Sequence, residues 1–234
     1  MISLPELHRR AVTFPGPGSR MAGLEAALVT IEEQLGHAKS QLTVRLRAKL
    51  KREAHDMESD DVEQLHYNLK ATVDELFPKV FRGGFVVSLW SVFEACVKDL
   101  AEYARREKNL PFGLQELRAG DFLEQMDMFF SRVLDVKAFP DRSVRTKLSE
   151  IKGLRNALAH HDGSANELPK SLRSNTGAAY EAKGLLLYSD LHHEYVVPTA
   201  LYAEQAHSVT RKYLDGLAQS VYKALHPLPL ADDA

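Results

Sequence analysis

The chain of 234 residues carries 30 Lys and Arg against 32 Asp and Glu, so its formal net charge at pH 7 is −2. This balance excludes attraction of nucleic acid by the overall charge, and any such binding must come from a local basic patch. With 44% hydrophobic and 26% charged residues, the composition is that of a globular protein with a real core, in one domain or two small ones.

Three features favour a soluble cytoplasmic protein with no membrane segment. The opening MISLPELHRR has no apolar core flanked by a cleavage site, so no signal peptide is expected. The most apolar run, FVVSLWSVFEACV (85–97), is too short for a membrane span and contains Glu94. The single cysteine, Cys96, excludes an internal disulfide and fits a reducing compartment.

The first part of the chain predicts an arm followed by a long helix. FPGPG (14–18) cannot continue a helix, so residues 1–20 are expected to form a flexible N-terminal arm. Residues 21–56 then carry apolar side chains at alternating steps of three and four: Leu24, Leu28, Ile31, Leu35, Ala38, Leu42 and Leu46. This pattern is typical of a coiled-coil seam, and the sequence leaves open whether the seam is a dimer contact or part of the core.

The rest of the chain predicts an all-α fold. In the core, 60–161, a second helix begins near Val62 and is interrupted or kinked by Pro78, and an apolar helix then runs from about 80 to 106. The remaining elements are a helix over 121–134, a helix from an Asp141 N-cap to His160 or His161 with Gly163 as its stop, a loop and β-hairpin within 162–197, and a last helix over 198–226. We therefore expect one domain, 21–226, that is a bundle of about five to six helices with a small β-hairpin before the C-terminal helix.

The stretch LRNALAHHDG (154–163) ends one of these helices and carries the strongest chemical signal. On a helical wheel Arg155 falls in the middle of an apolar stripe formed by Val144, Leu148, Ile151 and Leu158. The opposite polar face gathers Arg145, Ser149, Lys152, Asn156 and His160. Because Arg155 and His160 are about 140° apart on this wheel, we expect them to meet only if the last turn unwinds or if two chains contribute one residue each.

Arginine and histidine together suit cleavage of RNA by its own 2′-hydroxyl. Histidine titrates near neutral pH and can move the protons, while arginine offers a planar fork to the phosphate oxygens. This chemistry needs no metal and no cofactor. A structural alternative remains open, in which Arg155 pairs with a core carboxylate and His160 only caps the helix end.

Arg155, Asn156 and His160, at the end of a helix in an all-α chain, resemble the motif of the HEPN superfamily of nucleotide-binding domains. Its ribonuclease branch carries arginine, four to six intervening residues and histidine, often with a polar residue directly after the arginine. The family also has a polar or acidic residue on an earlier core helix, a position that Glu94, or Ser91, matches here in RGGFVVSLWSVFEACVKDL. The resemblance covers roughly residues 60–225.

The resemblance implies a metal-independent endoribonuclease that works as a homodimer in a toxin or antiviral-defence role. His160 would be the general acid and base, Arg155 would bind the phosphate, Asn156 would orient the backbone or substrate, and Glu94 would lie close to Arg155 and position it. The substrate-binding residues would be Lys152, Arg145 and His161. RNA and an antitoxin or defence protein are the expected partners, although Asp162 stands where toxins silenced by tyrosine modification carry that tyrosine.

The sequence also supports other interpretations of its fold and of single residues. The competing function is a non-catalytic helical module for dimerisation or for nucleotide or RNA binding. His192, His193 and Glu194 are expected to be exposed hairpin residues rather than a metal site. Cys96 is expected in the core, and Gly83-Gly84 is expected to ease helix packing because it lacks the lysine of a phosphate loop.

Overall fold

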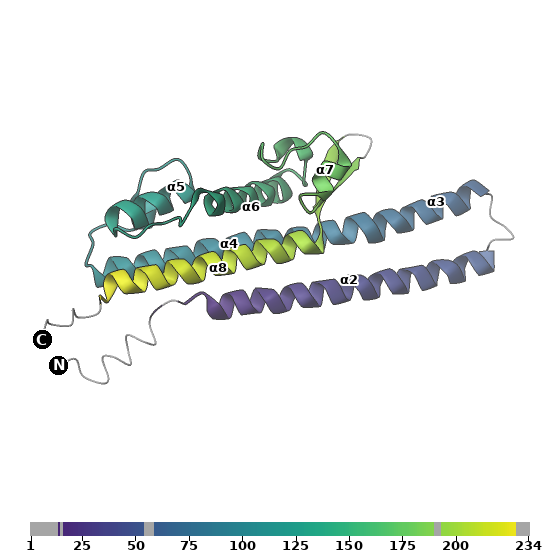
Figure 1. Cartoon of the computed structure of the whole chain (residues 1–234). Coiled ribbons are helices and arrows are strands. Elements are labelled where there is room, and N and C mark those ends of the chain that lie inside the picture. The colour runs from purple at the N-terminus through teal and green to yellow at the C-terminus, as the bar shows by residue number, and fades with distance from the viewer. Residues whose placement is uncertain (1–13, 15, 54–58, 190–192, 228–234) are drawn as a thin grey trace, which may run out of the picture. The chain divides into compact units, whose positions relative to one another are not determined.

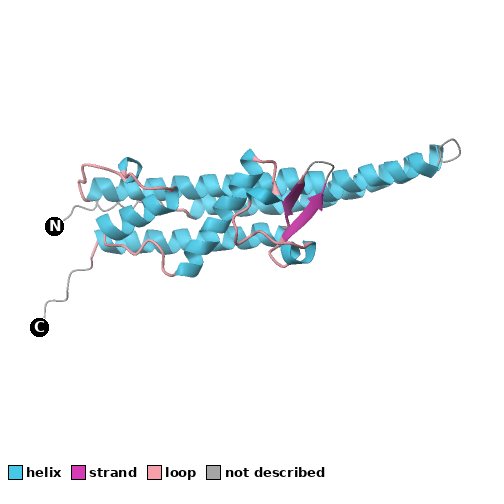
Figure 2. Cartoon of the chain, turned by 90° about the horizontal axis from the view of Figure 1, so that it is seen from above, coloured by secondary structure: helices cyan, strands magenta, loops and turns pink. Residues whose placement is uncertain are grey.

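The computed structural model describes residues 14, 16–53, 59–189 and 193–227. It confirms an all-α helical bundle with a small two-stranded hairpin before the C-terminal helix (Figures 1 and 2). The helices are α2 (Gly18–Glu53), α3 (Ser59–Lys70), α4 (Phe77–Glu107), α5 (Phe122–Asp127), α6 (Arg142–His160), α7 (Gly177–Glu181) and α8 (Ala200–Leu225). The strands β1 (Leu185–Ser189) and β2 (Glu194–Pro198) pair antiparallel, with Leu187 opposite Val196.

The chain divides into two compact units. Unit 1 comprises Met1–Ala22, Trp90–Ser149 and Ser208–Ala234, and unit 2 comprises Gly23–Leu89 and Glu150–His207. The predicted assignment of 21–226 to one HEPN-like domain stays a prediction.

In unit 1 the core is aromatic. Trp90 and Phe93 on α4 and Phe129 and Phe130 after α5 are all buried. The predicted N-cap at Asp141 is confirmed, because its carboxylate accepts a hydrogen bond from the Val144 backbone N–H. Asp121 caps α5 in the same way by accepting from the Glu124 N–H.

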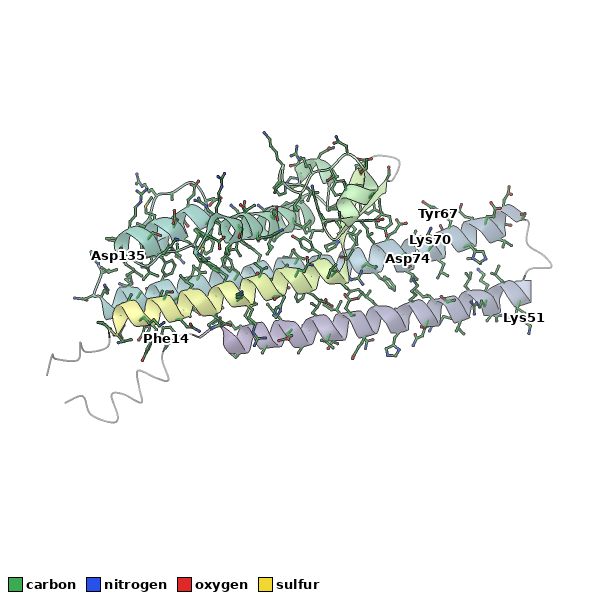
Figure 3. The ribbon with its side chains drawn as sticks, viewed as in Figure 1. Phe14, Lys51, Tyr67, Lys70, Asp74 and Asp135 are labelled. Carbon is green, nitrogen blue, oxygen red and sulfur yellow. The ribbon has the colours of Figure 1, made fainter. Side chains whose placement is uncertain are left out.

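The N-terminal arm is shorter than the sequence predicts. Residues 1–13 and 15 lie outside the described residues, but α2 already begins at Gly18 instead of residue 21. The Phe14 ring, labelled in Figure 3, contacts the rings of Tyr103 and Tyr222 edge-on, at centroid distances of 5.1 and 5.3 Å. Phe14 is therefore packed within unit 1, because an edge-to-face contact with two tyrosines is more favourable than an exposed ring.

In unit 2, α2 runs beside α3 and the start of α4 (Figure 1). Arg82 forms a bidentate pair with Glu32, at 2.7 Å from Nε and 2.6 Å from Nη2, and Lys39 Nζ lies 2.8 Å from Asp74 Oδ1. On the seam of α2, Leu28 and Leu46 are buried within the chain, whereas Leu24, Ile31, Leu35, Ala38 and Leu42 are half-buried. The seam is thus used inside the chain at least at its two buried leucines.

Pro78 does not end a helix, so the predicted interruption at this residue is wrong. The helical path continues through Ser59–Glu107, with a π-helical segment η1 (Ala71–Leu76) between α3 and α4. Pro78 has no N–H for the carbonyl of Asp74, four residues earlier, and that carbonyl instead accepts a hydrogen bond from the Tyr188 hydroxyl at 2.9 Å. A wider turn and a hydroxyl donor therefore accommodate the proline without ending the helix.

The helical stretch Ser59–Glu107 is also long and apolar enough to cross a membrane by length and composition. The core helix of a soluble protein passes the same test. In this stretch Val86, Leu89, Val97 and Leu100 are fully buried within the chain, which is the pattern of a core helix.

Candidate active site

The motif occupies the end of α6, in unit 2. The buried side chains of this segment are Ile151, Leu154 and Ala157, so the apolar stripe runs beside Arg155 and not through it. Arg155 and Leu158 are half-buried at the edge of that stripe. The prediction that Arg155 lies in the middle of the apolar stripe is therefore wrong. The helical wheel placed it there because Leu154 and Ala157 were not counted as part of the stripe.

The sequence locally determines where α6 ends. The Ala157 carbonyl accepts hydrogen bonds from the His161 N–H at 3.0 Å and from the Gly163 N–H at 2.9 Å. Asp162 and Gly163 follow with φ of 51° and 77°, a left-handed conformation that stops a helix and that glycine adopts readily. The predicted stop at Gly163 is confirmed.

Gly163 also ties the motif to the hairpin. Its carbonyl accepts a hydrogen bond from the Val196 N–H on β2 at 2.9 Å, and a Cβ at Gly163 would lie 3.0 Å from the Val196 carbonyl oxygen. The strand therefore passes too close for a side chain at this position. The turn after His160 and His161 is held by backbone contacts on both sides.

Arg155, Asn156 and His160 converge within one chain. Arg155 Nη1 donates to Asn156 Oδ1 at 2.9 Å and lies 3.4 Å from His160 Nε2. The expectation that a regular helix cannot bring Arg155 and His160 together is wrong, because α6 stays helical through His160. The wheel compares Cα directions only, whereas an arginine side chain is long enough to reach around the helix.

The three side chains differ in exposure and in hydrogen bonding. His160 is exposed, while Arg155 and Asn156 are half-buried. Since arginine only donates, its contact with His160 Nε2 is a hydrogen bond when that nitrogen carries no proton. Arg155 Nε is buried and has no partner among the described residues. The guanidinium therefore has one unsatisfied donor beside an accessible imidazole.

Glu94 belongs to unit 1, whereas Arg155, Asn156 and His160 belong to unit 2. Its Oε1 accepts a hydrogen bond from Trp90 Nε1 at 2.7 Å, and its Oε2 lies 3.8 Å from Lys98 Nζ one turn along α4. Glu94 thus satisfies the indole N–H of a buried tryptophan. That Glu94 lies close to Arg155 stays a prediction. Ser91, the other residue considered for this role, is exposed.

The predicted substrate-binding residues fall in both units. His161 is exposed and Lys152 half-buried near the motif in unit 2. Arg145 is in unit 1, where its guanidinium lies 5.5 Å from the centre of the Phe139 ring and 4.0 Å from Asp127 Oδ2. Arg145 therefore already has an acidic and an aromatic neighbour, and its role in binding substrate stays a prediction.

Sequence reasoning missed Lys79. Its Nζ lies 2.8 Å from Asp162 Oδ2, directly after the motif, and 4.1 Å from the centre of the Tyr195 ring on β2. The Lys79 side chain is 16% exposed and that of Asp162 is 72% exposed. No local sequence pattern predicts these contacts, because Lys79 is far from both Asp162 and Tyr195 in the sequence. We call Lys79, Asp162 and Tyr195 the lysine bridge.

Two tyrosines of the hairpin extend the lysine bridge toward η1. The Tyr195 ring stacks on that of Tyr188 at 5.8 Å, and its hydroxyl donates to Glu75 Oε2 at 3.1 Å. Burial, with the nearby Glu75 and Asp74 carboxylates, raises the pKa of Tyr188, so this phenol stays protonated and donates to the Asp74 carbonyl at neutral pH. Two hydroxyl groups of the hairpin therefore bind it to η1 within unit 2.

The structure also gives the positions of the histidines, the cysteine and the glycines for which the sequence predicts no catalytic role. His192 lies outside the described residues, and the described part of the chain contains no group of three or more His, Cys, Asp and Glu side chains placed to hold a metal. Cys96 is buried, as expected of a core residue. A Cβ on Gly83 would meet Leu158 Cδ2 of α6 at 3.4 Å, an ordinary contact distance, and a Cβ on Gly84 would meet nothing within 4 Å among the described residues. Close packing therefore does not require glycine at either position, contrary to the sequence prediction.

Comparison of the chain with protein-family models, with curated proteins and with solved structures gives no match.

Proposed function

We propose that the protein is a metal-independent endoribonuclease of the HEPN type. The observation that supports this most directly is the 3.4 Å contact between Arg155 Nη1 and His160 Nε2, with Asn156 on the same guanidinium. A phosphate that entered here would meet a cation and a proton-transfer group at once. His160 is exposed, and Arg155 Nε is buried with no hydrogen-bond partner among the described residues.

The proposed reaction is attack of a ribose 2′-hydroxyl on the adjacent phosphorus. His160 with Nε2 unprotonated accepts the proton of that hydroxyl, and the bond from phosphorus to the 5′ oxygen breaks as the bond to the 2′ oxygen forms. Arg155 offers its N–H groups to the phosphate oxygens as negative charge builds on them. The leaving 5′ oxygen takes a proton from a protonated imidazole, and the product carries a 2′,3′-cyclic phosphate.

If the two proton transfers occur together, one imidazole must be neutral and a second protonated, and a homodimer with two motifs would supply both. Exposed apolar side chains where η1 meets α4 support this pairing: Leu76, Val80 and Phe81 are 51, 58 and 47% exposed. We call these three residues the exposed patch, because exposed apolar side chains that lie together commonly mark contact surfaces. Lys79 directly precedes Val80 in α4, and its ammonium contacts Asp162 at the end of the motif. The patch is therefore adjacent in sequence to a residue that contacts the motif.

The proposal is tested with purified protein, total RNA and EDTA. Wild type is expected to produce fragments with 2′,3′-cyclic phosphate ends, whereas His160→Ala loses at least a hundredfold in rate, the typical contribution of a general acid or base. His37→Ala, at an exposed histidine of α2, is the matched control and should cut at the wild-type rate. Intact RNA with wild type, or equal cutting by wild type and His160→Ala, would refute the nuclease.

The exposed patch equally favours the alternative, a non-catalytic module that dimerises or binds RNA. In that case RNA is retarded on a native gel but never cleaved, and His160→Ala changes neither result. A toxin or antiviral-defence role, with an antitoxin or defence protein as partner, is proposed only together with the nuclease. For that role we expect expression of the wild-type protein to halt cell growth and expression of His160→Ala to leave growth unchanged.

A further inference from the structure

Unit 1 contains a pocket of about 560 Å³ between the start of α6 and the face of α8. This volume lies within the range of about 300–1,000 Å³ that small-molecule sites occupy. All of its lining residues belong to 137–147 and 209–220. The pocket is therefore formed within a single unit and includes none of the motif residues.

The floor of the pocket is apolar and its polar atoms are already satisfied. Ala138, Tyr213 and Leu217 are buried in it. The Tyr213 hydroxyl donates to the Ala138 carbonyl at 2.8 Å, and burial raises the pKa of this phenol, so it stays uncharged. A ligand on this floor would gain from burying apolar surface and would find no free hydrogen-bonding partner there.

The rim is predominantly basic. Lys137, Lys147 and Lys212 line it, against Asp141 as the one acidic lining residue. The Asp141 carboxylate is engaged in capping α6, where it accepts from the Ser143 hydroxyl at 2.6 Å and from the Val144 N–H at 3.0 Å. The Ser143 hydrogen bond and, to a smaller extent, the charge of Lys137 lower the pKa of Asp141, so the carboxylate offsets part of the positive charge at the rim. Lys212 forms no salt bridge with the described residues, and three lysines against one carboxylate leave the rim net positive. An anionic group at the rim would therefore be attracted.

A glycine keeps the pocket open. Gly216 lies inside α8, where glycine weakens a helix relative to alanine. A Cβ at this position would meet nothing within 4 Å, so no close approach of another segment among the described residues requires glycine. The missing side chain leaves space over the floor.

We propose that this pocket binds a small amphipathic monocarboxylate, with its apolar body on the Tyr213–Leu217 floor and its carboxylate beside Lys137 and Lys212. The apolar floor disfavours a ligand rich in polar groups, and the net positive rim disfavours an amphipathic cation. The proposal is independent of the ribonuclease, because it uses none of the motif residues.

The test is calorimetric titration of the full chain with decanoate below its micelle-forming concentration. Decyltrimethylammonium, with the same tail and the opposite charge, is the ligand control. We expect saturable binding of one decanoate per chain and no saturable binding of the cation. Binding of both ligands alike, or of neither, overturns the proposal.

Two variants locate the binding. Gly216→Leu fills the open space and should weaken decanoate binding at least tenfold, whereas Gly36→Leu, at an α2 glycine that also has nothing within 4 Å, should leave it unchanged. Lys212→Glu reverses an exposed charge and should weaken binding about tenfold without disturbing the fold. Circular dichroism checks that each variant is folded. Decanoate binding that is unchanged in Gly216→Leu or in Lys212→Glu would show that the ligand sits elsewhere.

Discussion

Loss of the Lys79 charge tests whether the lysine bridge holds the end of the motif helix. Lys79→Met keeps most of the apolar stem but removes the ammonium, which lies 2.8 Å from Asp162 Oδ2 and 4.1 Å from the Tyr195 ring centre. Since the Asp162 side chain is 72% exposed, water screens the ion pair strongly. We therefore assign the ion pair about 0.2–1 kcal/mol.

The cation–π contact adds about 0.5–2 kcal/mol, toward the upper end because the Lys79 side chain is only 16% exposed. Together the two contacts predict that Lys79→Met lowers the free energy of unfolding by about 1–3 kcal/mol. For a chain of this length each kcal/mol corresponds to about 2–4 °C in Tm. Urea unfolding followed by circular dichroism measures the difference.

A double-mutant cycle separates the ion pair from the ring contact. Asp162→Asn removes the charge but suits the backbone, since asparagine tolerates the positive φ of 51° at this position. The coupling between Lys79→Met and Asp162→Asn should be about 0.2–1 kcal/mol and should shrink in 1 M salt. Lys170→Met, at an exposed lysine, is the control for loss of a surface charge. The reasoning is wrong if Lys79→Met is as neutral as Lys170→Met, or if the cycle shows no coupling.

Three further predictions concern the surroundings of the motif and the core. Tyr188→Phe removes the donor to the Asp74 carbonyl and should cost about 1–2 kcal/mol in urea unfolding, whereas Tyr67→Phe, at an exposed ring, should be neutral. Gly153→Ala should destabilise the protein by about 1–3 kcal/mol despite its better helix propensity, because the new Cβ would lie 2.6 Å from Pro169 Cγ; a stabilised variant would contradict this packing. Burial raises the pKa of the Cys96 thiol, so thiolate forms only at higher pH than usual, and labelling by a disulfide reagent at pH 8 should be slow until urea unfolds the chain; rapid labelling of the folded protein would contradict the burial.

The site illustrates where sequence reasoning succeeds and where it errs. The end of the motif helix followed from Gly163, because a left-handed turn depends on one residue and its neighbours. The meeting of Arg155 with His160 was missed although the two are only five residues apart. A wheel of Cα directions ignores side-chain length, and that length decides the contact.

By itself the sequence determined the all-α class, the Asp141 cap, the end of the motif helix and the hairpin. These features depend on hydrogen bonds and apolar spacing within a few residues, which the order of amino acids records directly. Only the tertiary structure decided that Lys79 reaches Asp162, that Tyr188 satisfies the carbonyl freed by Pro78, and that α6 and α8 enclose a basic-rimmed pocket. Each of these contacts joins residues distant in sequence, and they form only because the packing of apolar faces brings separate helices and the hairpin together.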